Sequence, residues 1–164
     1  MKPFYKDELT TIYNCPCVNG KSDILVLDPP YIVNPNDYKY KILYAFTGIN
    51  NLFYYMMAIF PRTGQPIRWH SYNKRFVNED YILYVGDRIL PELPKFERDE
   101  TYHKWQRPLG LMCLLLKGLR GDVLDPFMGS GSTLVATKRL GMHSVGYETD
   151  GDLCRVAVKR LECE

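Results

Sequence analysis

Four residues that directly follow an apolar run could hold an amine. The run at positions 24–27 ends at Asp28, Pro29, Pro30 and Tyr31, which we call the 28–31 turn. Neither proline has an N–H for a sheet ladder, and each keeps the preceding residue out of the helical region, so we expect a turn at the end of a strand. The turn offers a carboxylate, free backbone carbonyls and an aromatic face, which together suit a planar amine. An ordinary strand-to-loop turn is the plainer interpretation, but ligands of open α/β sheets bind at this edge.

A second segment, the 125–133 loop, has the pattern of a nucleoside-binding site. It follows a short apolar run, contains Gly129 and Gly131, and leads into a helix expected over 134–140. Glycines let the backbone approach a ligand at a helix N-terminus, where N–H groups point outward. Glu148 lies nineteen positions after Gly129, which is the spacing of an acid that binds ribose hydroxyls. Because Leu134 replaces a third glycine and no Gly-Lys-Ser/Thr follows, a nucleoside without phosphates is favoured over a dinucleotide or a triphosphate.

The elements around these turns predict a single α/β domain over residues 1–164, with a polar N-terminal arm at 1–10. Strands are expected at 11–13, 23–27, 64–69, 81–85, 123–125 and 144–147, and helices at 109–119 and 134–140. Apolar residues recur at positions 42, 46, 49, 53, 56 and 60, which predicts a long amphipathic helix that ends before Pro61. Helices that alternate with short buried strands indicate a mostly parallel, twisted sheet with helices on both faces.

The composition excludes several classes of protein. With 46% hydrophobic and 24% charged residues and a net charge of +2, the chain is typical of a soluble globular protein, and nucleic-acid binding would need a local patch. Five cysteines without a CxxC pair predict reduced thiols, not a metal site or disulfides. No run approaches the ~20 apolar residues of a membrane span, and the first residues lack a secretory pattern. We therefore expect a cytoplasmic protein with no metal and no membrane contact.

The two turns resemble the catalytic and S-adenosylmethionine motifs of DNA amino-methyltransferases, the N6-adenine and N4-cytosine enzymes. The catalytic motif comes first, as in the permuted, beta-type group of many restriction–modification systems. Residues 103–108, His-Lys-Trp-Gln-Arg-Pro, are similar to that group's His-Pro-x-Gln-Lys-Pro segment, with Lys104 for the first proline and Arg107 for the lysine. In a weaker match, Trp69 and residues 79–83 resemble the family's Trp-x-Lys and Glu-x-x-Leu strand segments. The resemblance covers residues 11–161 and implies a Rossmann-like methyltransferase fold with circularly permuted motif order, in a prokaryotic or phage-encoded enzyme.

The resemblance implies S-adenosylmethionine as cofactor, DNA as substrate, and a role for each matched residue. The 28–31 turn would be catalytic: Asp28 and the Pro29 carbonyl would accept the two hydrogens of an exocyclic base amine, and Tyr31 would stack on the extruded base. The residues expected to bind the cofactor are His103, Gln106, Pro108, Asp125, Pro126, Phe127, Gly129, Gly131, Ser132, Thr133 and Glu148.

The choice of base and the recognition of DNA rest on weaker signals. Aspartate at the first catalytic position favours N6 of adenine by family association, with N4 of cytosine as the alternative. The basic and aromatic cluster at 68–75 offers Arg68, Lys74 and Arg75 as candidate DNA contacts, although a solvated strand end is the plainer interpretation.

Two departures from the family pattern favour a second function. Relatives usually carry a target-recognition domain before the His-Pro segment, but only seventeen residues separate Val85 from His103. Near Asn14, where relatives often have a Gly-Asp pair at the cofactor adenine, this chain has Asn-Cys-Pro. Recognition would then come from short loops, a homodimer or a separate recognition subunit, or the chain is a non-catalytic DNA-binding or partner subunit. The intact 28–31 turn, 125–133 loop and Glu148 argue against the non-catalytic alternative.

Overall fold

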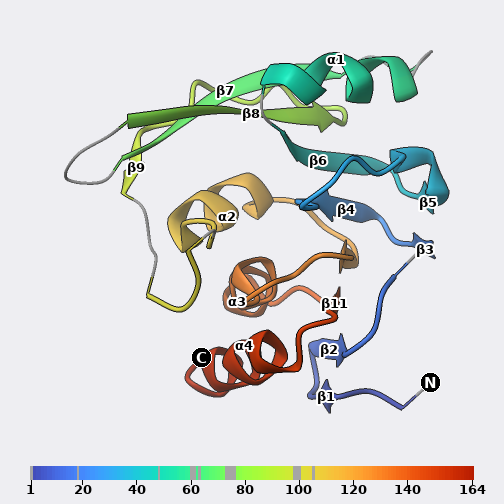
Figure 1. Cartoon of the computed structure of the whole chain (residues 1–164), viewed down its shortest axis with the longest axis vertical. Coiled ribbons are helices and arrows are strands. Elements are labelled where there is room, and N and C mark those ends of the chain that lie inside the picture. Colours follow the sequence, from blue (N-terminus) through green and yellow to red (C-terminus); the bar gives the residue numbers. More distant parts are fainter. Residues whose placement is uncertain are drawn as a thin grey trace.

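The computed structural model describes residues 2–17, 19–47, 49–59, 62, 64–72, 77–97, 101–104 and 106–164. Within them, nine strands form one sheet in the order β1-β2-β11-β10-β4-β6-β8-β7-β9, and β3 pairs with β5 (Figure 1). The strands are β1 (Tyr5–Lys6), β2 (Thr10–Tyr13), β3 (Gly20–Lys21), β4 (Ile24–Leu27), β5 (Tyr38–Lys39), β6 (Ile42–Thr47), β7 (Gln65–Tyr72), β8 (Val77–Val85), β9 (Phe96–Glu97), β10 (Val123–Asp125) and β11 (Ser144–Tyr147). The helices are α1 (Ile49–Ala58), α2 (Leu109–Leu116), α3 (Ser132–Arg139) and α4 (Gly151–Glu162), with a 3₁₀ turn η1 (Pro35–Asp37).

The centre of the sheet is parallel and contains a switch point. The neighbours β2, β11, β10, β4 and β6 all run in the same direction, whereas β8 is antiparallel to both β6 and β7. From β10 the chain passes through α3 to β11 on one side, and after β4 the next strand of the main sheet, β6, lies on the other side. The strand order therefore reverses between β10 and β4, and ligands of open α/β sheets bind outside the carboxyl ends of such strands. The expected mostly parallel α/β sheet is confirmed.

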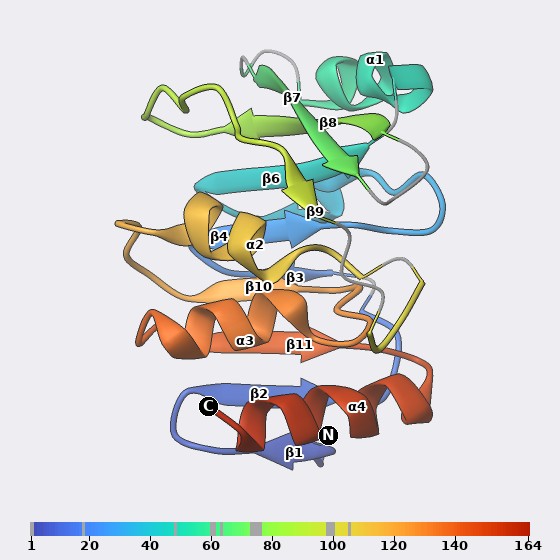
Figure 2. The ribbon, with the colours of Figure 1, turned by 90° about the vertical axis from the view of Figure 1, so that its left-hand side faces the viewer.

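Both faces of the sheet are covered, and this is why β4 is apolar at every position. Ile24 and Val26 belong to the core that includes α2, and Leu25 and Leu27 belong to the core that includes α1. This alternation follows from the two-residue period of a strand. Figure 2 shows α2, α3 and α4 together in front of the sheet.

The long helix expected from position 42 to position 60 is wrong over its first part. Residues 42–47 form β6, which is paired with β4 and β8 in the middle of the sheet, and only Ile49–Ala58 are helical. The buried face of α1 also differs from the expected one, because Tyr55 is 2% exposed whereas Phe53 is 72% exposed. A short apolar run with aromatic residues satisfies both the helical and the strand period. Residues 42–47 form a strand because they pair with β4 and β8. Phe60 lies outside the described residues.

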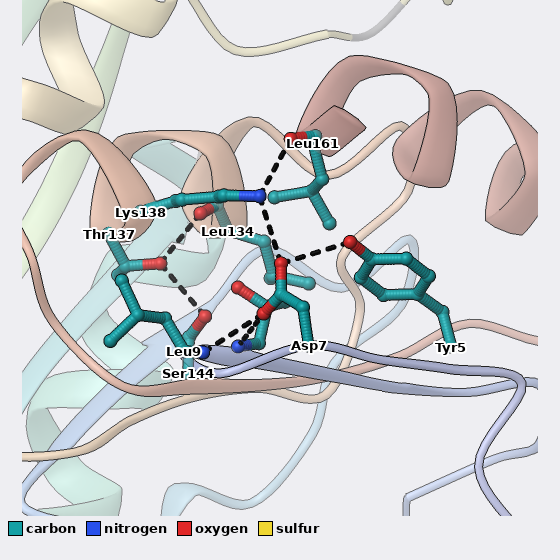
Figure 3. A network of polar contacts seen from close by, with 9 residues as sticks. Tyr5, Asp7, Leu9, Leu134, Thr137, Lys138, Ser144 and Leu161 are labelled. Carbon is teal, nitrogen blue, oxygen red and sulfur yellow. Dashed lines mark hydrogen bonds and ion pairs between the residues drawn. The ribbon is translucent and has the colours of Figure 1, made fainter. Parts of the chain in front are cut away.

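Part of the polar segment at 1–10, expected as an N-terminal arm, pairs with the edge of the sheet. β1 pairs antiparallel with β2, and Asp7 accepts hydrogen bonds from the Tyr5 hydroxyl at 2.9 Å and from Lys138 Nζ at 2.9 Å (Figure 3). Lys138 also donates to the Leu161 carbonyl at 2.8 Å. Burial alone would raise the pKa of Asp7, but the bonds from Lys138, the Thr10 backbone and Tyr5 lower it to about 2. This network fastens the first residues to α3 and α4.

The cysteines and the helices show two further features. All five cysteines are free thiols, with Cys113 in α2 and Cys154 in α4. None of the helices in the described ranges has the length and apolar character needed to cross a bilayer.

Candidate functional site

The 28–31 turn and the 125–133 loop meet at the switch point. β4 and β10 are parallel neighbours with Leu25 opposite Leu124, so both segments leave the sheet at the same edge. A cavity of about 840 Å³ opens there, a size typical of small-molecule sites. The expected site residues that line it are Asp28, Pro29, Pro30, Tyr31, His103, Gln106, Asp125, Pro126, Phe127, Gly129, Ser132, Thr133 and Glu148.

The Asp28 carboxylate is held by an arginine. Arg107 Nε donates to Asp28 Oδ2 and Arg107 Nη2 donates to Oδ1, both at 2.6 Å, which is a two-point, charge-assisted pairing. The guanidinium carbon lies 5.0 Å from the centroid of the Phe46 ring and 5.5 Å from that of Trp69. Burial by itself would lower the pKa of Arg107, but the charge and hydrogen bonds of Asp28 raise it. The sequence marked Arg107 only as a departure from the family's lysine, and the pairing with Asp28 was not foreseen.

Asp125 is a buried acid at the other side of the switch point. Its side chain is 3% exposed, and its Oδ1 accepts the Phe127 N–H at 3.0 Å. Burial raises the pKa of Asp125 to about 7, hydrogen bonds from Thr133 and Phe127 oppose the rise, and the nearby Asp28 carboxylate adds to it. Asp125 therefore ties the strand end to the loop, and its charge changes near neutral pH.

The two loop glycines have different surroundings. Gly129 (φ +53°) lines the cavity, and a Cβ there would meet no atom within 4 Å. At Gly131 (φ +81°) a Cβ would lie 2.8 Å from the Cβ of Ala157 in α4. Gly131 and Pro108, both expected to bind the cofactor, are not among the residues that line the cavity. Gly131 instead lets α4 approach the start of α3, and Pro108 directly precedes α2.

Glu148, just beyond β11, bonds to the glycine loop. Its Oε2 accepts the Gly129 N–H at 3.1 Å. The Asn14 side-chain amide donates to the Glu148 carbonyl at 2.9 Å, which ties the end of β2 to the same point. Cys15 and Pro16 line the cavity. The segment that departs from the family's Gly-Asp pair thus still forms part of the cavity wall.

Arg160, in α4, donates hydrogen bonds to the glycine loop. Its Nη1 donates to the Ser130 carbonyl at 2.7 Å and to Ser132 Oγ at 3.3 Å, and its side chain is 7% exposed. Ser130 Oγ in turn donates to Gln106 Oε1 at 3.3 Å. Sequence reasoning missed Arg160, because nothing in the pattern separates it from the other basic residues of the last helix.

The exposed ring of Tyr31 lies beside a second, smaller cavity. Tyr31 is 64% exposed and meets the Phe127 ring edge-on, with centroids 5.9 Å apart. The smaller cavity, of about 130 Å³, shares Asp28, Tyr31 and Arg107 with the larger one. The Tyr31 ring and the Asp28–Arg107 pair therefore border both spaces.

Arg68, the candidate DNA contact among the described residues, is not one of the residues that line the cavity. Arg68 is exposed on β7, opposite Tyr81 of β8. The strand continues to Tyr72, so the cluster begins within a strand and does not follow one. Lys74 and Arg75 lie outside the described residues.

Two solved methyltransferase structures share this fold. The structure described as an M1.HpyAVI–SAM complex matches with a TM-score of 0.67 and 23% identity, over 86% of this chain and 89% of that one. The PvuII DNA methyltransferase (cytosine-N4-specific) matches with a TM-score of 0.67 and 11% identity, over 97% of this chain and 88% of that one.

Sequence comparisons find bacterial relatives and a family. The type II methyltransferase M.HindIII of Haemophilus influenzae is 46% identical over 91 residues, which are 54% of this chain and 27% of that protein. M2.DpnII of Streptococcus pneumoniae is 40% identical over 73 residues, 43% of this chain and likewise 27% of that protein. The chain thus spans about a quarter of the length of these relatives. The family of N6/N4 methyltransferases, described as DNA methylase, matches residues 69–159. Because this match covers more than half of the 164 residues, the chain belongs to the N6/N4 DNA methylase family.

Proposed function

We propose that this chain transfers a methyl group from S-adenosylmethionine to an exocyclic amine of a DNA base, with N6 of adenine as the first choice. The observation that carries the proposal is that the 28–31 turn and the 125–133 loop line one cavity at the switch point. Two motifs far apart in the sequence would thereby bring the base amine, which accepts the methyl group, and the methyl donor together.

The residues of the larger cavity fit S-adenosylmethionine. Space is open beside Gly129, at the start of a helix, and Glu148 stands at the neighbouring strand end. The charges of Asp28 and Arg107 cancel in their ion pair, and the lining also carries the carboxylates of Asp37 and Glu148 and the buried acid Asp125. An acidic wall suits a cationic nucleoside better than a phosphorylated one. Gly129, Phe127 and Glu148 would hold the nucleoside, and His103 and Gln106 would lie toward the methionine end of the cofactor.

The chemistry assigned to this chain is orientation and charge stabilisation. The amine of a base is a poor nucleophile because its lone pair is delocalised into the ring. Asp28 and the Pro29 carbonyl would accept the two amine hydrogens, direct the lone pair toward the methyl group, and stabilise the positive charge that develops on nitrogen. When bound, S-adenosylmethionine would supply a methyl group on a positively charged sulfur, which would keep the bonding electron pair as a neutral thioether, and the methylated nitrogen would release one proton to Asp28 or to water. Tyr31, exposed at the edge of the cavity, would stack on a base taken out of the duplex.

The adenine preference rests on the aspartate at the start of the 28–31 turn, and cytosine N4 is the alternative within the same chemistry. Motif order supports assignment to the permuted, beta-type group, because the catalytic turn precedes the cofactor loop along the chain. Recognition of a DNA sequence is assigned to short loops, a homodimer or a separate subunit. Arg68, Lys74 and Arg75 remain the candidate DNA contacts.

A non-catalytic DNA-binding or partner subunit is the competing function, favoured by the altered segment after Asn14. Calorimetric titration with S-adenosylmethionine separates the two functions. The enzyme should release heat on binding, and the absence of heat and of competition by a cofactor analogue would favour the non-catalytic subunit.

Modification-sensitive sequencing of a host genome tests the base assignment. Cells that express the chain should gain N6-methyladenine in one sequence context, and cells that express Asp28→Ala should not. N4-methylcytosine in its place would select the alternative, and an unmodified genome would count against the enzyme.

A further inference from the structure

We propose that Arg107 is a positioning residue that fixes the Asp28 carboxylate for methyl transfer, which rests on the proposed function. The guanidinium of Arg107 is bonded to both oxygens of Asp28. Arg107 acts through Asp28, and the family's lysine at this position could perform that task only in part.

The pairing leaves Asp28 able to accept an amine hydrogen. An ionised carboxylate has about four lone-pair positions, and the guanidinium takes one on each oxygen, at 2.6 Å in both cases. One position on each oxygen stays available. Because two parallel bonds fix both the plane and the rotation of the carboxylate, the remaining positions point in a defined direction.

The guanidinium is itself held in place. It lies against the rings of Phe46 and Trp69, and Trp69 is 1% exposed in the core. The charge of Asp80, which lines the smaller cavity, also favours the protonated arginine. Aromatic faces attract a guanidinium as well as limiting its motion. The orientation of Asp28 therefore derives from a buried framework in β6, β7 and β8, not from the turn alone.

The location of the pair connects it with the reaction. Asp28 and Arg107 line both the cavity of about 840 Å³ and the one of about 130 Å³. A carboxylate in the wall between two spaces can meet an amine on one side and a methyl donor on the other. Misplacement by 1 Å at such a point costs about a hundredfold in rate.

The test compares Arg107→Lys and Arg107→Gln with a matched pair of controls. Arg139 makes the same two-point contact with Glu164, again at 2.6 Å for both bonds, but at the end of α3 and away from the cavity. Arg139→Lys and Arg139→Gln thus report the loss of an arginine–carboxylate fork without any effect on Asp28. Initial rates on DNA give kcat and KM, and calorimetry gives Kd for S-adenosylmethionine.

We expect Arg107→Gln to lower kcat about a hundredfold and Arg107→Lys about tenfold, because lysine keeps the charge but not the fork. Kd for S-adenosylmethionine should change by no more than about twofold, since Arg107 orients the carboxylate that accepts the amine and is not assigned a contact with the cofactor. Added guanidinium should partly restore kcat to Arg107→Ala in a saturable way, and urea of the same shape should not. The Arg139 variants should retain the wild-type kcat.

Four results would overturn the inference. An Arg107→Gln protein as fast as wild type would show that Asp28 needs no partner, and a faster one would show that the pair blocks the reaction. A loss equal in kcat and in cofactor binding, without rescue by guanidinium, would indicate a purely structural role. A wild-type chain that binds S-adenosylmethionine but methylates no DNA would instead refute the proposed function, and the inference with it.

Discussion

Substitution of Gly131 by alanine should destabilise the fold through a contact between α3 and α4. Gly131 has φ +81°, and a Cβ there would lie 2.8 Å from the Cβ of Ala157. Gly141 is a matched control, because its φ of +67° carries the same backbone strain but a Cβ would meet nothing within 4 Å. The difference between Gly131→Ala and Gly141→Ala isolates the steric part of the effect.

The magnitude follows from two terms. An L-residue in the left-handed region costs about 1 kcal/mol, which applies to both variants. Overpacking of a buried contact costs about 1–3 kcal/mol, and this applies to Gly131→Ala alone. We therefore expect the free energy of unfolding to fall by about 3 kcal/mol for Gly131→Ala and by about 1 kcal/mol for Gly141→Ala.

Urea unfolding followed by circular dichroism measures both values. The double variant Gly131→Ala with Ala157→Gly should recover part of the steric loss, because it removes the atom that the new Cβ would meet. A favourable coupling energy in this double-mutant cycle is the expected result. If Gly131→Ala were no more destabilising than Gly141→Ala, or if the cycle showed no coupling, the claim that α3 and α4 pack closely at Gly131 would be refuted.

Three further predictions concern charges and the loop. Asp7→Asn should lower the free energy of unfolding at pH 7 by about 1 to 2 kcal/mol. The folded pKa of Asp7, about 2, is below the unfolded value of 3.8. The wild-type protein should therefore lose this extra stability as acid titration lowers the pH from 3.8 to about 2. Asp125 behaves in the opposite sense, because its folded pKa of about 7 exceeds 3.8: wild-type stability should fall as pH rises between these values, and Asp125→Asn should show no such fall in urea titrations at several pH values. Arg160→Met should weaken S-adenosylmethionine binding about tenfold in calorimetry, since charged hydrogen bonds to the loop are lost; unchanged affinity would show that the loop keeps its shape without Arg160.

The elements that carry strong local signals were predictable from the sequence. β4 and β10 are short, wholly buried runs that are followed within two residues by a proline, and the glycines after β10 mark the start of a helix. Their meeting at one sheet edge also follows from general rules for parallel sheets. The spacing from Gly129 to Glu148 predicted a nucleoside ligand, and the order of the two motifs predicted the methyltransferase group.

The partners of the site residues were not predictable in the same way. Arg107 and Asp28 are 79 positions apart, and Arg160 and Ser130 are 30 apart, so no local period connects them. The misassigned helix at 42–47 has the same origin. Its apolar residues satisfy a helical period, and only pairing with β4 and β8 makes them a strand. The contact of Gly131 with α4 was equally unpredictable, because its motif predicts a ligand contact and carries no signal of helix packing.

Transfer of a radiolabelled methyl group from S-adenosylmethionine to DNA, compared between wild type and Asp28→Ala, is the most direct test of the central claim. Wild type should label DNA, and Asp28→Ala should not, while both bind the cofactor with equal Kd. Labelling by Asp28→Ala at the wild-type rate would contradict the assignment of the 28–31 turn as the site that receives the amine.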